Sequence, residues 1–356
     1  MQTLAPSSIQ VIEKQLFAEG ISASALMEEA SAQMARAIQE WHPIPGVCLA
    51  VFGKGHNGGD ALVIARILSQ KGWEVVLFPA FPSNSLAPLT SEKWNAAGLC
   101  NTLPITSLES WNPDPARPLI VLDGLLGIGA SGKLQPPIAQ ATKAINALRQ
   151  RSHAKVFAID IPTGLNGLTG EAEENTIIAD ATLTVAFAKP GLLADGAANW
   201  TGSLHGVPLT LLESRASESK QTNLQLITSQ FLTSDWPRRK AESHKGTYGR
   251  VALVAGSKGT VGAAILAAKG ALRSGAGLVS LWVPENVYIC AVAGAPAECM
   301  VQSYNSASDI DLSTATALGI GPGVGFDHAD SILSLIANFE GPAVVDADAL
   351  TMIASQ

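Results

Sequence analysis

Apolar positions near the start of the chain recur at the spacing of α-helices. Residues 7 to 41 are predicted to form two helices, and Ser7 or Ser8 is expected to cap the first of them. The second helix carries one apolar stripe, which consists of Leu26, Ala30, Met34, Ile38 and Trp41. Because the stripe lies on a single face of the helix, we expect it to belong to the core.

Short apolar and β-branched runs then alternate with helical segments. The predicted strands are Val47 to Phe52, Val75 to Phe78, Leu119 to Leu122, Val156 to Ile161 and Thr182 to Phe187, and the predicted helices are Ala61 to Lys71 and Pro137 to Arg151. Strand-helix-strand units of this length form parallel sheets, so we expect an open, doubly wound sheet in an α/β domain. Ligands bind such sheets at the carboxyl ends of the strands, where the loops Gly53 to Asp60, Asp123 to Lys133 and Asp160 to Gly164 fall.

A change of composition marks the end of this domain. From Leu212 to Lys245 the chain is richer in Ser, Thr, Gln and charge, and it carries Asp235, Pro237, Arg238 and Arg239. A second α/β unit is predicted from a strand at Arg250 to Ala255, a glycine turn at Gly256 to Gly262, a helix at Ala263 to Arg273 and a strand at Leu278 to Val283. We therefore expect one domain at residues 1–215, a linker and entry segment at 216–245, and the first part of another domain at 246–356.

The composition agrees with two compact α/β domains. The chain has 356 residues, of which 47% are apolar, and this is enough for two hydrophobic cores. The formal net charge of −7 argues against a nucleic-acid backbone or an anionic membrane as the main partner. We find no targeting or anchoring segment, and the cysteines Cys48, Cys100, Cys290 and Cys299 form no C-x-x-C pair, so we expect a cytoplasmic protein without a zinc site.

A glycine-rich stretch, GKGHNGGD from Gly53 to Asp60, leaves the first predicted strand and opens a helix. Its backbone N–H groups can point at a phosphate with the helix dipole behind them. The match to G-x-G-x-x-G is weak by itself, because a tight strand-to-helix turn needs the same glycines. A dinucleotide-binding dehydrogenase would place an acidic residue at the end of the second strand, where Pro79 and Ala80 stand.

Two further loops carry a carboxylate directly after a predicted strand. Asp123 begins the string DGLLGIG, and Asp160 begins DIPTG, in which Thr163 adds a hydroxyl. Taken singly, each aspartate is explained more simply as a cap at the start of a loop than as a catalytic group. Together with Asn57 and Asp60 at one sheet edge, they favour a binding or catalytic site.

These motifs and Lys189-Pro190-Gly191 resemble, over residues 10–215, the N-terminal domain family of NAD(P)H-hydrate epimerases. The resemblance implies a Rossmann-like, three-layer αβα fold and a potassium ion held by Asn57, Asp123 and Thr163. It also implies that Asp160 is the catalytic residue at the reacting ring. The implied substrate-binding residues are His56, Asn57, Gly58, Gly59, Asp60, Gly127, Ile128, Gly129, Ala130, Ser131, Gly132, Lys133 and Asp160.

Two positions depart from the pattern of that family. His56 stands where a second asparagine is common, and Glu29 stands where another asparagine is frequent. An imidazole can still donate a hydrogen bond, although an exposed turn residue is the simpler interpretation. Either change could alter affinity without abolishing the chemistry.

The second domain has glycine-rich turns before small-residue helices, at Gly256 to Ala264 and Gly319 to Gly325. With His244 to Arg250 and DADAL at Asp346 to Leu350, these strings are similar to the ADP- or ATP-dependent NAD(P)H-hydrate dehydratases of the ribokinase-like superfamily. The resemblance implies ADP or ATP with magnesium as cofactors, and a hydrate pocket lined in part by Ala263, Ala264, Gly323 and Gly325, although helix-to-sheet packing explains these small residues equally well. The later Lys-Gly and Gly-Ser-Gly-Asp elements of that family have no counterpart and the chain ends abruptly, so we expect an incomplete domain without dehydratase activity of its own.

The implied reaction is the epimerisation of hydrated NADH or NADPH at C6, the carbon that carries both a hydroxyl and ring nitrogen N1. Protonation of the hydroxyl lets the nitrogen expel water, and water re-enters the planar iminium from the other face. We expect Asp160 to shuttle the proton, since a partly apolar cleft favours a protonated carboxyl group, although orienting the substrate is the simpler role. Potassium would organise the loops and offset phosphate charge.

Two other functions compete with this interpretation. A nicotinamide-dependent dehydrogenase is disfavoured by the missing acid at the end of the second strand. A nucleotide-binding scaffold without catalysis is disfavoured by the intact set of polar loop residues. The preference for the hydrate of NADH or of NADPH stays open, and a homo-oligomer is expected.

Overall fold

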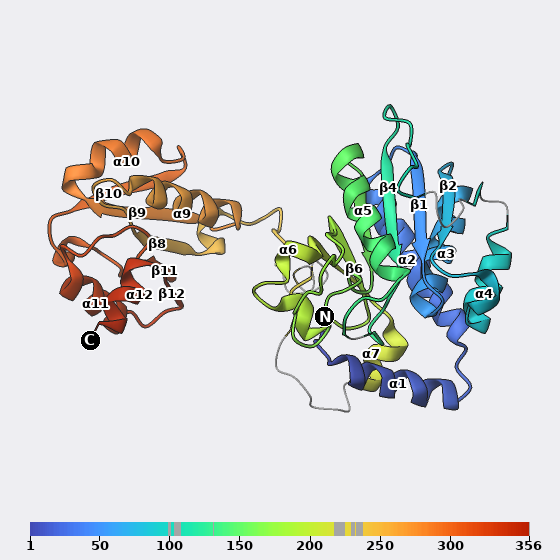
Figure 1. The fold of residues 1–356 in the computed structure, drawn as a ribbon. Coiled ribbons are helices and arrows are strands. Elements are labelled where there is room, and N and C mark those ends of the chain that lie inside the picture. The colour runs from blue at the N-terminus through green and yellow to red at the C-terminus, as the bar shows by residue number, and fades with distance from the viewer. Residues whose placement is uncertain are drawn as a thin grey trace. The chain divides into compact units, whose positions relative to one another are not determined.

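The computed structural model describes residues 1–98, 101–102, 108–130, 132–216, 225–228, 232 and 238–355. The chain divides into two compact units, Met1–Trp236 and Pro237–Gln356 (Figure 1). Each unit has its own parallel sheet and its own hydrophobic cores.

Seven parallel strands form the sheet of the first unit, in the order β3-β2-β1-β4-β5-β6-β7. They are β1 (Val47–Phe52), β2 (Glu74–Pro79), β3 (Asn101–Thr102), β4 (Leu119–Gly124), β5 (Lys155–Ile159), β6 (Ala181–Val185) and β7 (Ser203–Val207). Phe52 of β1 lies beside Gly124 of β4, and Asp123 lies beside Ala158 of β5. The loops that follow these three neighbouring strands therefore leave the sheet at one edge, as the sequence predicted.

Helices cover both faces of this sheet. They are α1 (Pro6–Ala18), α2 (Ala23–Trp41), α3 (His56–Gln70), α4 (Pro88–Ala96), α5 (Ile138–Ser152), α6 (Ala198–Thr201) and α7 (Thr210–Ala216), with 3-10 turns at Ser83–Ser85 and Pro190–Leu193. Cys48 and Phe52 of β1 pack in one core with α1, α2 and α3, whereas Val47 and Val51 pack in another with α5. Burial on both faces explains why the strands are continuous apolar runs, and the expected three-layer α/β architecture is confirmed.

Two helices begin before the residues that the sequence pattern indicated. Neither Ser7 nor Ser8 caps α1, because the helix begins at Pro6. Proline suits the first helical position, where its missing N–H would have had no partner and its fixed φ is already helical. Helix α3 begins at His56 and not at Ala61, which puts the whole string from His56 to Asp60 inside the helix.

The apolar stripe of α2 is buried in its middle and less buried at its ends. Ala30, Met34 and Ile38 are buried, whereas Trp41 is 41% exposed and Leu26 borders a cavity described below. The stripe is therefore core in its middle, Leu26 is partly buried against the same core, and Trp41 at the other end is partly exposed. A helix of 19 residues is longer than the six-residue strand β1 against which this layer packs, so its ends extend beyond the sheet.

The second unit has a sheet of five parallel strands, in the order β10-β9-β8-β11-β12. Its elements are β8 (Arg250–Val254), α9 (Val261–Arg273), β9 (Leu278–Pro284), α10 (Tyr288–Gly294), β10 (Cys299–Tyr304), β11 (Ala317–Ile320), α11 (Ala329–Asn338), β12 (Ala343–Val345) and α12 (Asp348–Ala354), with 3-10 turns at Lys245–Tyr248, Glu285–Val287 and Ala307–Asp309. Leu253 packs in one core with α9 and α10, and Val254 packs in the other with α11 and α12. The expected α/β class of this part of the chain is confirmed.

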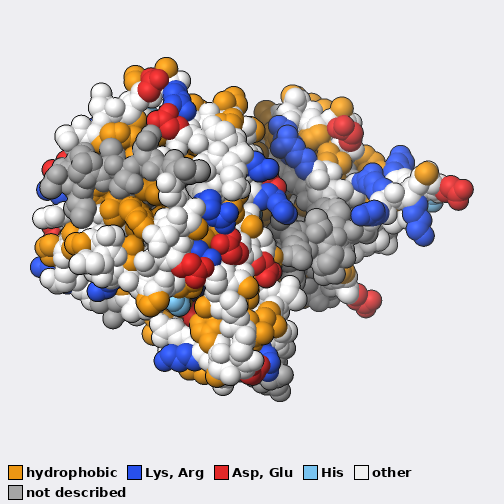
Figure 2. Space-filling view, turned by 90° about the vertical axis from the view of Figure 1, so that its right-hand side faces the viewer, with side chains coloured by type: hydrophobic (Ala, Val, Ile, Leu, Met, Phe, Trp, Pro, Cys, Tyr) orange, Lys and Arg blue, Asp and Glu red, His pale blue; other side chains and the backbone are white. Residues whose placement is uncertain are grey.

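The surface shows no exceptional segregation of side chains on the face drawn in Figure 2, where basic, acidic and hydrophobic groups are interspersed. Such a mixture is ordinary for a globular α/β protein. Within the described residues, no helix is both long enough and apolar enough to cross a bilayer.

Candidate active site

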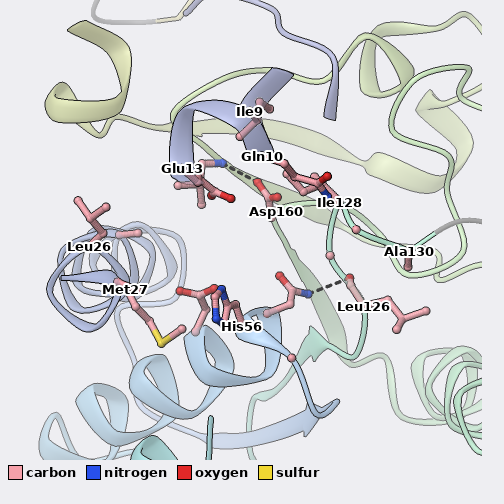
Figure 3. A pocket seen from close by; sticks show the side chains of 18 of the residues that line it. Ile9, Gln10, Glu13, Leu26, Met27, His56, Leu126, Ile128, Ala130 and Asp160 are labelled. Atoms are coloured by element: carbon pink, nitrogen blue, oxygen red, sulfur yellow. Dashed lines mark hydrogen bonds between the residues drawn. The ribbon is translucent and has the colours of Figure 1, made fainter. Parts of the chain in front are cut away.

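A cavity of about 470 Å³ lies at the carboxyl edge of the first sheet. Its walls come from α1, α2, the start of α3, the loop after β4 and the end of β5 (Figure 3). The volume falls within the range of small-molecule sites. Eight of the residues expected to bind substrate line it, namely His56, Asn57, Asp60, Gly127, Ile128, Gly129, Ala130 and Asp160.

A second cavity, of about 360 Å³, adjoins the first and shares with it the lining residues Lys54, Phe81, Leu126, Gly127 and Ala130. Gly132 and Lys133, also expected to bind substrate, line this second cavity. Ser131 lies outside the described residues. The two cavities together border most of the loop after β4.

The glycines of the GKGHNGGD string serve mainly to pack the turn. A Cβ atom on Gly58 would lie 2.2 Å from the carbonyl oxygen of Gly53, and one on Gly59 would lie 2.7 Å from Cε of Met27. Gly55, by contrast, has no other heavy atom within 4 Å of the equivalent position and is exposed toward the cavity. Gly55 is therefore the glycine of this string that is open to a ligand, whereas Gly58 and Gly59 support the site by allowing close packing.

The different surroundings of Gly58 and Gly55 predict different effects of an added methyl group on stability. We expect Gly58→Ala to lower the free energy of unfolding by about 1–3 kcal/mol, because the added methyl group overlaps a backbone oxygen that cannot rotate away. The matched variant Gly55→Ala adds the same methyl group in open space, so its change is expected to stay below about 1 kcal/mol. Urea unfolding of both variants measures the difference. Equal destabilisation would contradict the packing role.

The carboxyl group of Asp160 is held by two residues, one at the end of β6 and one in the segment that follows it. Its Oδ1 accepts a hydrogen bond from the N–H of Val185 at 3.0 Å and forms an ion pair with Nζ of Lys189. Lys189 is only 1% exposed, and its Nζ also donates to Oγ1 of Thr184 at 3.0 Å. Oδ2 of Asp160 makes no hydrogen bond with a described residue, so it is the oxygen left for a ligand in the cavity.

The backbone at Asp160 is unusual, since its φ of +66° lies in the left-handed region. Aspartate and asparagine adopt this conformation more readily than most residues. The N–H of Asp160 donates to the carbonyl of Leu183 at 2.9 Å, which ties the turn to β6. This turn fixes the position of the carboxyl group after the end of β5.

The sequence did not single out Lys189 or Glu13 as site residues. Both line the cavity with Asp160, and Figure 3 shows Glu13 of α1 close to Asp160. Lys189 belongs to the KPG string that carried the family resemblance, and this string is a signal for Lys189 but not for its pairing with Asp160. Nothing in the local sequence distinguishes Glu13 from a surface glutamate.

Two carboxyl groups of the cavity have raised pKa values. Burial, and next the charge of Asp160, raise the pKa of Glu13 to about 7, against the opposing effect of Lys189. Burial and the charge of Asp160 also raise the pKa of Asp60 well above its usual range, although Ser31 donates a hydrogen bond to its Oδ1 at 3.2 Å. Around neutral pH Glu13 can therefore carry a proton, which suits proton-transfer chemistry.

The three residues expected to hold potassium form one hydrogen-bonded cluster. Oγ1 of Thr163 donates to Oδ1 of Asp123 at 2.7 Å, and the N–H of Thr163 donates to Oδ2 at 2.8 Å. Nδ2 of Asn57 donates to the carbonyl of Leu126 at 2.9 Å, and the N–H of Leu126 donates to Thr163 Oγ1 at 3.1 Å. Asp123 is fully buried, and burial raises its pKa to about 6 against the hydrogen bonds from Thr163 and Leu125.

The two positions that depart from the family's pattern have different surroundings. His56 lies at the first turn of α3, exposed and lining the cavity (Figure 3). Glu29 is exposed on α2 and is not among the residues that line either cavity. The change at His56 is thus the one that can affect a ligand directly.

A nicotinamide-dependent dehydrogenase would have an acidic residue at the end of its second strand, but β2 has no acidic residue at this end. Strand β2 ends at Pro79, and its acidic residue, Glu74, stands at the opposite end, where it pairs with Arg117. This arrangement disfavours recognition of a ribose by the usual carboxylate of nicotinamide-dependent dehydrogenases.

In the second unit, the expected site residues divide between a loop and the core. Gly323 and Gly325 lie after β11 with φ values of +62° and +70°. The carbonyl of Gly323 accepts a hydrogen bond from Thr260 Oγ1 at 2.6 Å, which joins this loop to the start of α9, where Ala263 is half-buried. Ala264 is completely buried in the core with α9 and α10, so packing explains this residue.

Comparison with known proteins agrees with the two-unit organisation. Residues 23–191 match the family described as YjeF-related protein N-terminus, and residues 251–356 match NAD(P)H-hydrate dehydratase. The chain is 34% identical over 352 residues to the bifunctional NAD(P)H-hydrate repair enzyme Nnr of Coxiella burnetii, covering 97% of this chain and 70% of that protein. It is 34% identical over 313 residues to the enzyme of the same name from Escherichia coli, covering 86% of this chain and 58% of that protein.

A similar fold is found in the crystal structure of a yeast protein, with a TM-score of 0.52 and 19% sequence identity. The match covers 64% of this chain and 98% of the yeast chain. At this identity the likeness concerns the fold alone.

Proposed function

Since the chain belongs to the family of bifunctional NAD(P)H-hydrate repair enzymes, we propose that its first unit interconverts the R and S forms of hydrated NADH and NADPH at C6. We assign residues 1–215 to this epimerase domain, 216–245 to a connecting segment and 246–356 to part of a dehydratase domain. The observation that carries the proposal is the cavity in which Asp160 faces the loop after β4 and the start of α3.

The cavity has the groups that a dinucleotide needs. The N–H groups at the start of α3, near Gly55 and His56, offer donors and a positive dipole end to a phosphate. Lys54 borders both cavities and adds a positive charge there. Leu26 and Met27 supply an apolar wall on which a nicotinamide ring can lie.

Asp160 is suited to take a proton from the water that adds to C6. Lys189 supplies a counter-charge on Oδ1, so Oδ2 remains a hydrogen-bond acceptor directed at the substrate. As the hydroxyl leaves, N1 becomes positively charged, and a carboxylate at this position stabilises that charge. The planar ion then exposes both faces of C6 to water, which permits inversion.

The Asn57, Asp123 and Thr163 cluster fits a potassium ion by its donor chemistry. An amide oxygen, a hydroxyl and the neighbouring carbonyl of Leu126 are neutral oxygen donors, and Asp123 adds one negative charge. Hard oxygen donors with a low total charge suit a monovalent cation. When bound, potassium would supply a positive charge that holds the loops after β4 and β5 together.

This assignment predicts that the response to potassium depends on pH. Because the pKa of buried Asp123 is raised to about 6, the folded chain binds this proton more tightly than the unfolded chain, and Asp123 weakens the fold as the pH rises through 6. A cation offsets this loss only when Asp123 is ionised. We therefore expect potassium chloride to raise the melting temperature more at pH 8 than at pH 5, relative to choline chloride at equal ionic strength.

A matched variant identifies the group responsible for this dependence. Asp123→Asn is expected to remove the difference between potassium and choline at both pH values. If the wild-type chain responds equally at pH 5 and pH 8, Asp123 is not the ligand whose charge matters.

The epimerase proposal is tested directly by following the separated R and S hydrates of NADH and of NADPH by chromatography, with and without the purified chain. We expect both isomers to approach the same equilibrium mixture faster than in buffer alone, and faster in potassium than in choline chloride. If the chain binds the hydrates without accelerating their interconversion, a nucleotide-binding module is the better description.

For the second unit, we propose a part in the dehydration of the same hydrates, with ADP or ATP and magnesium as the cofactors of the complete protein. The match to NAD(P)H-hydrate dehydratase over residues 251–356 supports this assignment. The loops after β8 and β11, joined through Thr260 and Gly323, are the places where its ligands would bind.

A further inference from the structure

The proposed epimerisation needs a proton donor for the departing hydroxyl as well as an acceptor for the entering water. Asp160 is assigned above to the entering water, through the carboxyl oxygen that has no hydrogen-bond partner among the described residues. Its Oδ1 already accepts from both Lys189 and the N–H of Val185. The donor must therefore be sought elsewhere on the wall of the cavity.

Glu13 is a carboxyl group of the cavity that the fold leaves without a partner. It projects from α1, which is anchored by the buried side chains of Ile9, Ile12 and Leu16, so its position is fixed by packing. Among the described residues, none forms a hydrogen bond or an ion pair with it. Figure 3 shows Glu13 near Asp160, on the side of the cavity away from His56.

We propose that Glu13 is a second catalytic residue, which donates the proton that turns the C6 hydroxyl into water. This inference rests on the proposed epimerase function. The C6–O bond breaks, its electron pair leaves with the oxygen, and the Glu13 proton completes the water molecule. The N1 lone pair forms the C6–N1 double bond of the iminium.

The second half of the reaction restores both groups. A water oxygen adds to C6, the double-bond pair returns to N1, and the surplus proton goes to Oδ2 of Asp160. Because Glu13 and Asp160 line one cavity, the proton passes from Asp160 back to Glu13 inside that cavity. Water and protons balance over the cycle, and no further reactant is consumed.

The charges around Glu13 suit a group that gives up a proton near neutrality. Asp160 faces it from the end of β5, Asp60 from α3 and Lys189 from the segment after β6, while Lys54 and His56 stand at the start of α3. Burial and the charge of Asp160 outweigh Lys189 and raise the pKa of Glu13 to about 7. The acid form is therefore present at physiological pH, as a general acid requires.

The test compares Glu13→Gln with Glu13→Asp and with Glu19→Gln. Glu19 follows the end of the same helix, pairs with Arg215 and does not line the cavity, which makes its variant a matched control. We expect Glu13→Gln to lower kcat for interconversion by roughly 10²-fold with KM changed less than about threefold, Glu13→Asp to regain part of the rate, and Glu19→Gln to behave as wild type.

The pH profile separates catalysis from packing. The wild-type kcat is expected to fall as the pH rises above about 7, because Glu13 loses the proton that it must donate, and this decline is expected to be absent in Glu13→Gln. A Glu13→Gln rate within threefold of wild type, or an effect confined to KM, would overturn the role of Glu13 while leaving the epimerase function in place. An inactive wild-type chain would instead remove the epimerase proposal itself, and the inference with it.

Discussion

Lys189→Met is expected to lower the free energy of unfolding by about 3–5 kcal/mol, the largest change in stability that we anticipate for one polar side chain of the first unit. Lys189 is 1% exposed, and its Nζ is the charge partner of Asp160. Methionine preserves most of the volume but leaves the partly buried carboxylate of Asp160 without its counter-charge. Urea unfolding at pH 7 measures the change.

Two further variants show whether the loss comes from the orphaned charge. Lys155→Met removes a lysine that also pairs with an aspartate, Asp180, but whose side chain is 54% exposed, so we expect less than about 1 kcal/mol. The double variant Lys189→Met, Asp160→Asn removes both charges and is expected to recover part of the lost stability. If Lys189→Met alone is as stable as wild type, the ion pair does not hold this wall of the cavity together.

Asp160→Asn is expected to reduce kcat for epimerisation on the order of 10³-fold, the largest effect on activity that we anticipate. Asparagine keeps the shape of the side chain and tolerates the φ of +66°, but it can neither accept a proton at this position nor stabilise the positive charge of the iminium. Alanine would be a poorer test, because it adds backbone strain to the loss of the carboxylate. The rate is followed by chromatographic separation of the R and S hydrates.

The control for this variant is Asp195→Asn, which changes an exposed aspartate that does not line the cavity. It is expected to leave the rate unchanged. Near-ultraviolet circular dichroism shows whether Asp160→Asn keeps the wild-type fold. A variant with native spectra and a rate within threefold of wild type would exclude Asp160 from the chemistry.

Much of the fold could be predicted from the sequence, because the alternation of strands and helices is a local property. Continuous apolar runs such as Val47–Phe52 identify strands that are buried on both faces, and parallel strands place their following loops at one edge. The sequence therefore predicts that Asp123 and Asp160 lie at the same sheet edge as the GKGHNGGD turn. The starts of α1 and α3 do not follow from the sequence, because Pro6 and the GHNGG string are compatible with both turn and helix.

What the sequence by itself determined is thus the α/β architecture and the edge of the sheet at which the loops gather, since both follow from local periodicity and chain direction. Only the tertiary structure decided which charges meet. Glu13 comes from the first helix and Lys189 from the segment after β6, and neither has a local pattern that points to Asp160. Their protonation and pairing depend on burial and on the distances between segments far apart in the chain, and these quantities exist only once the chain has folded.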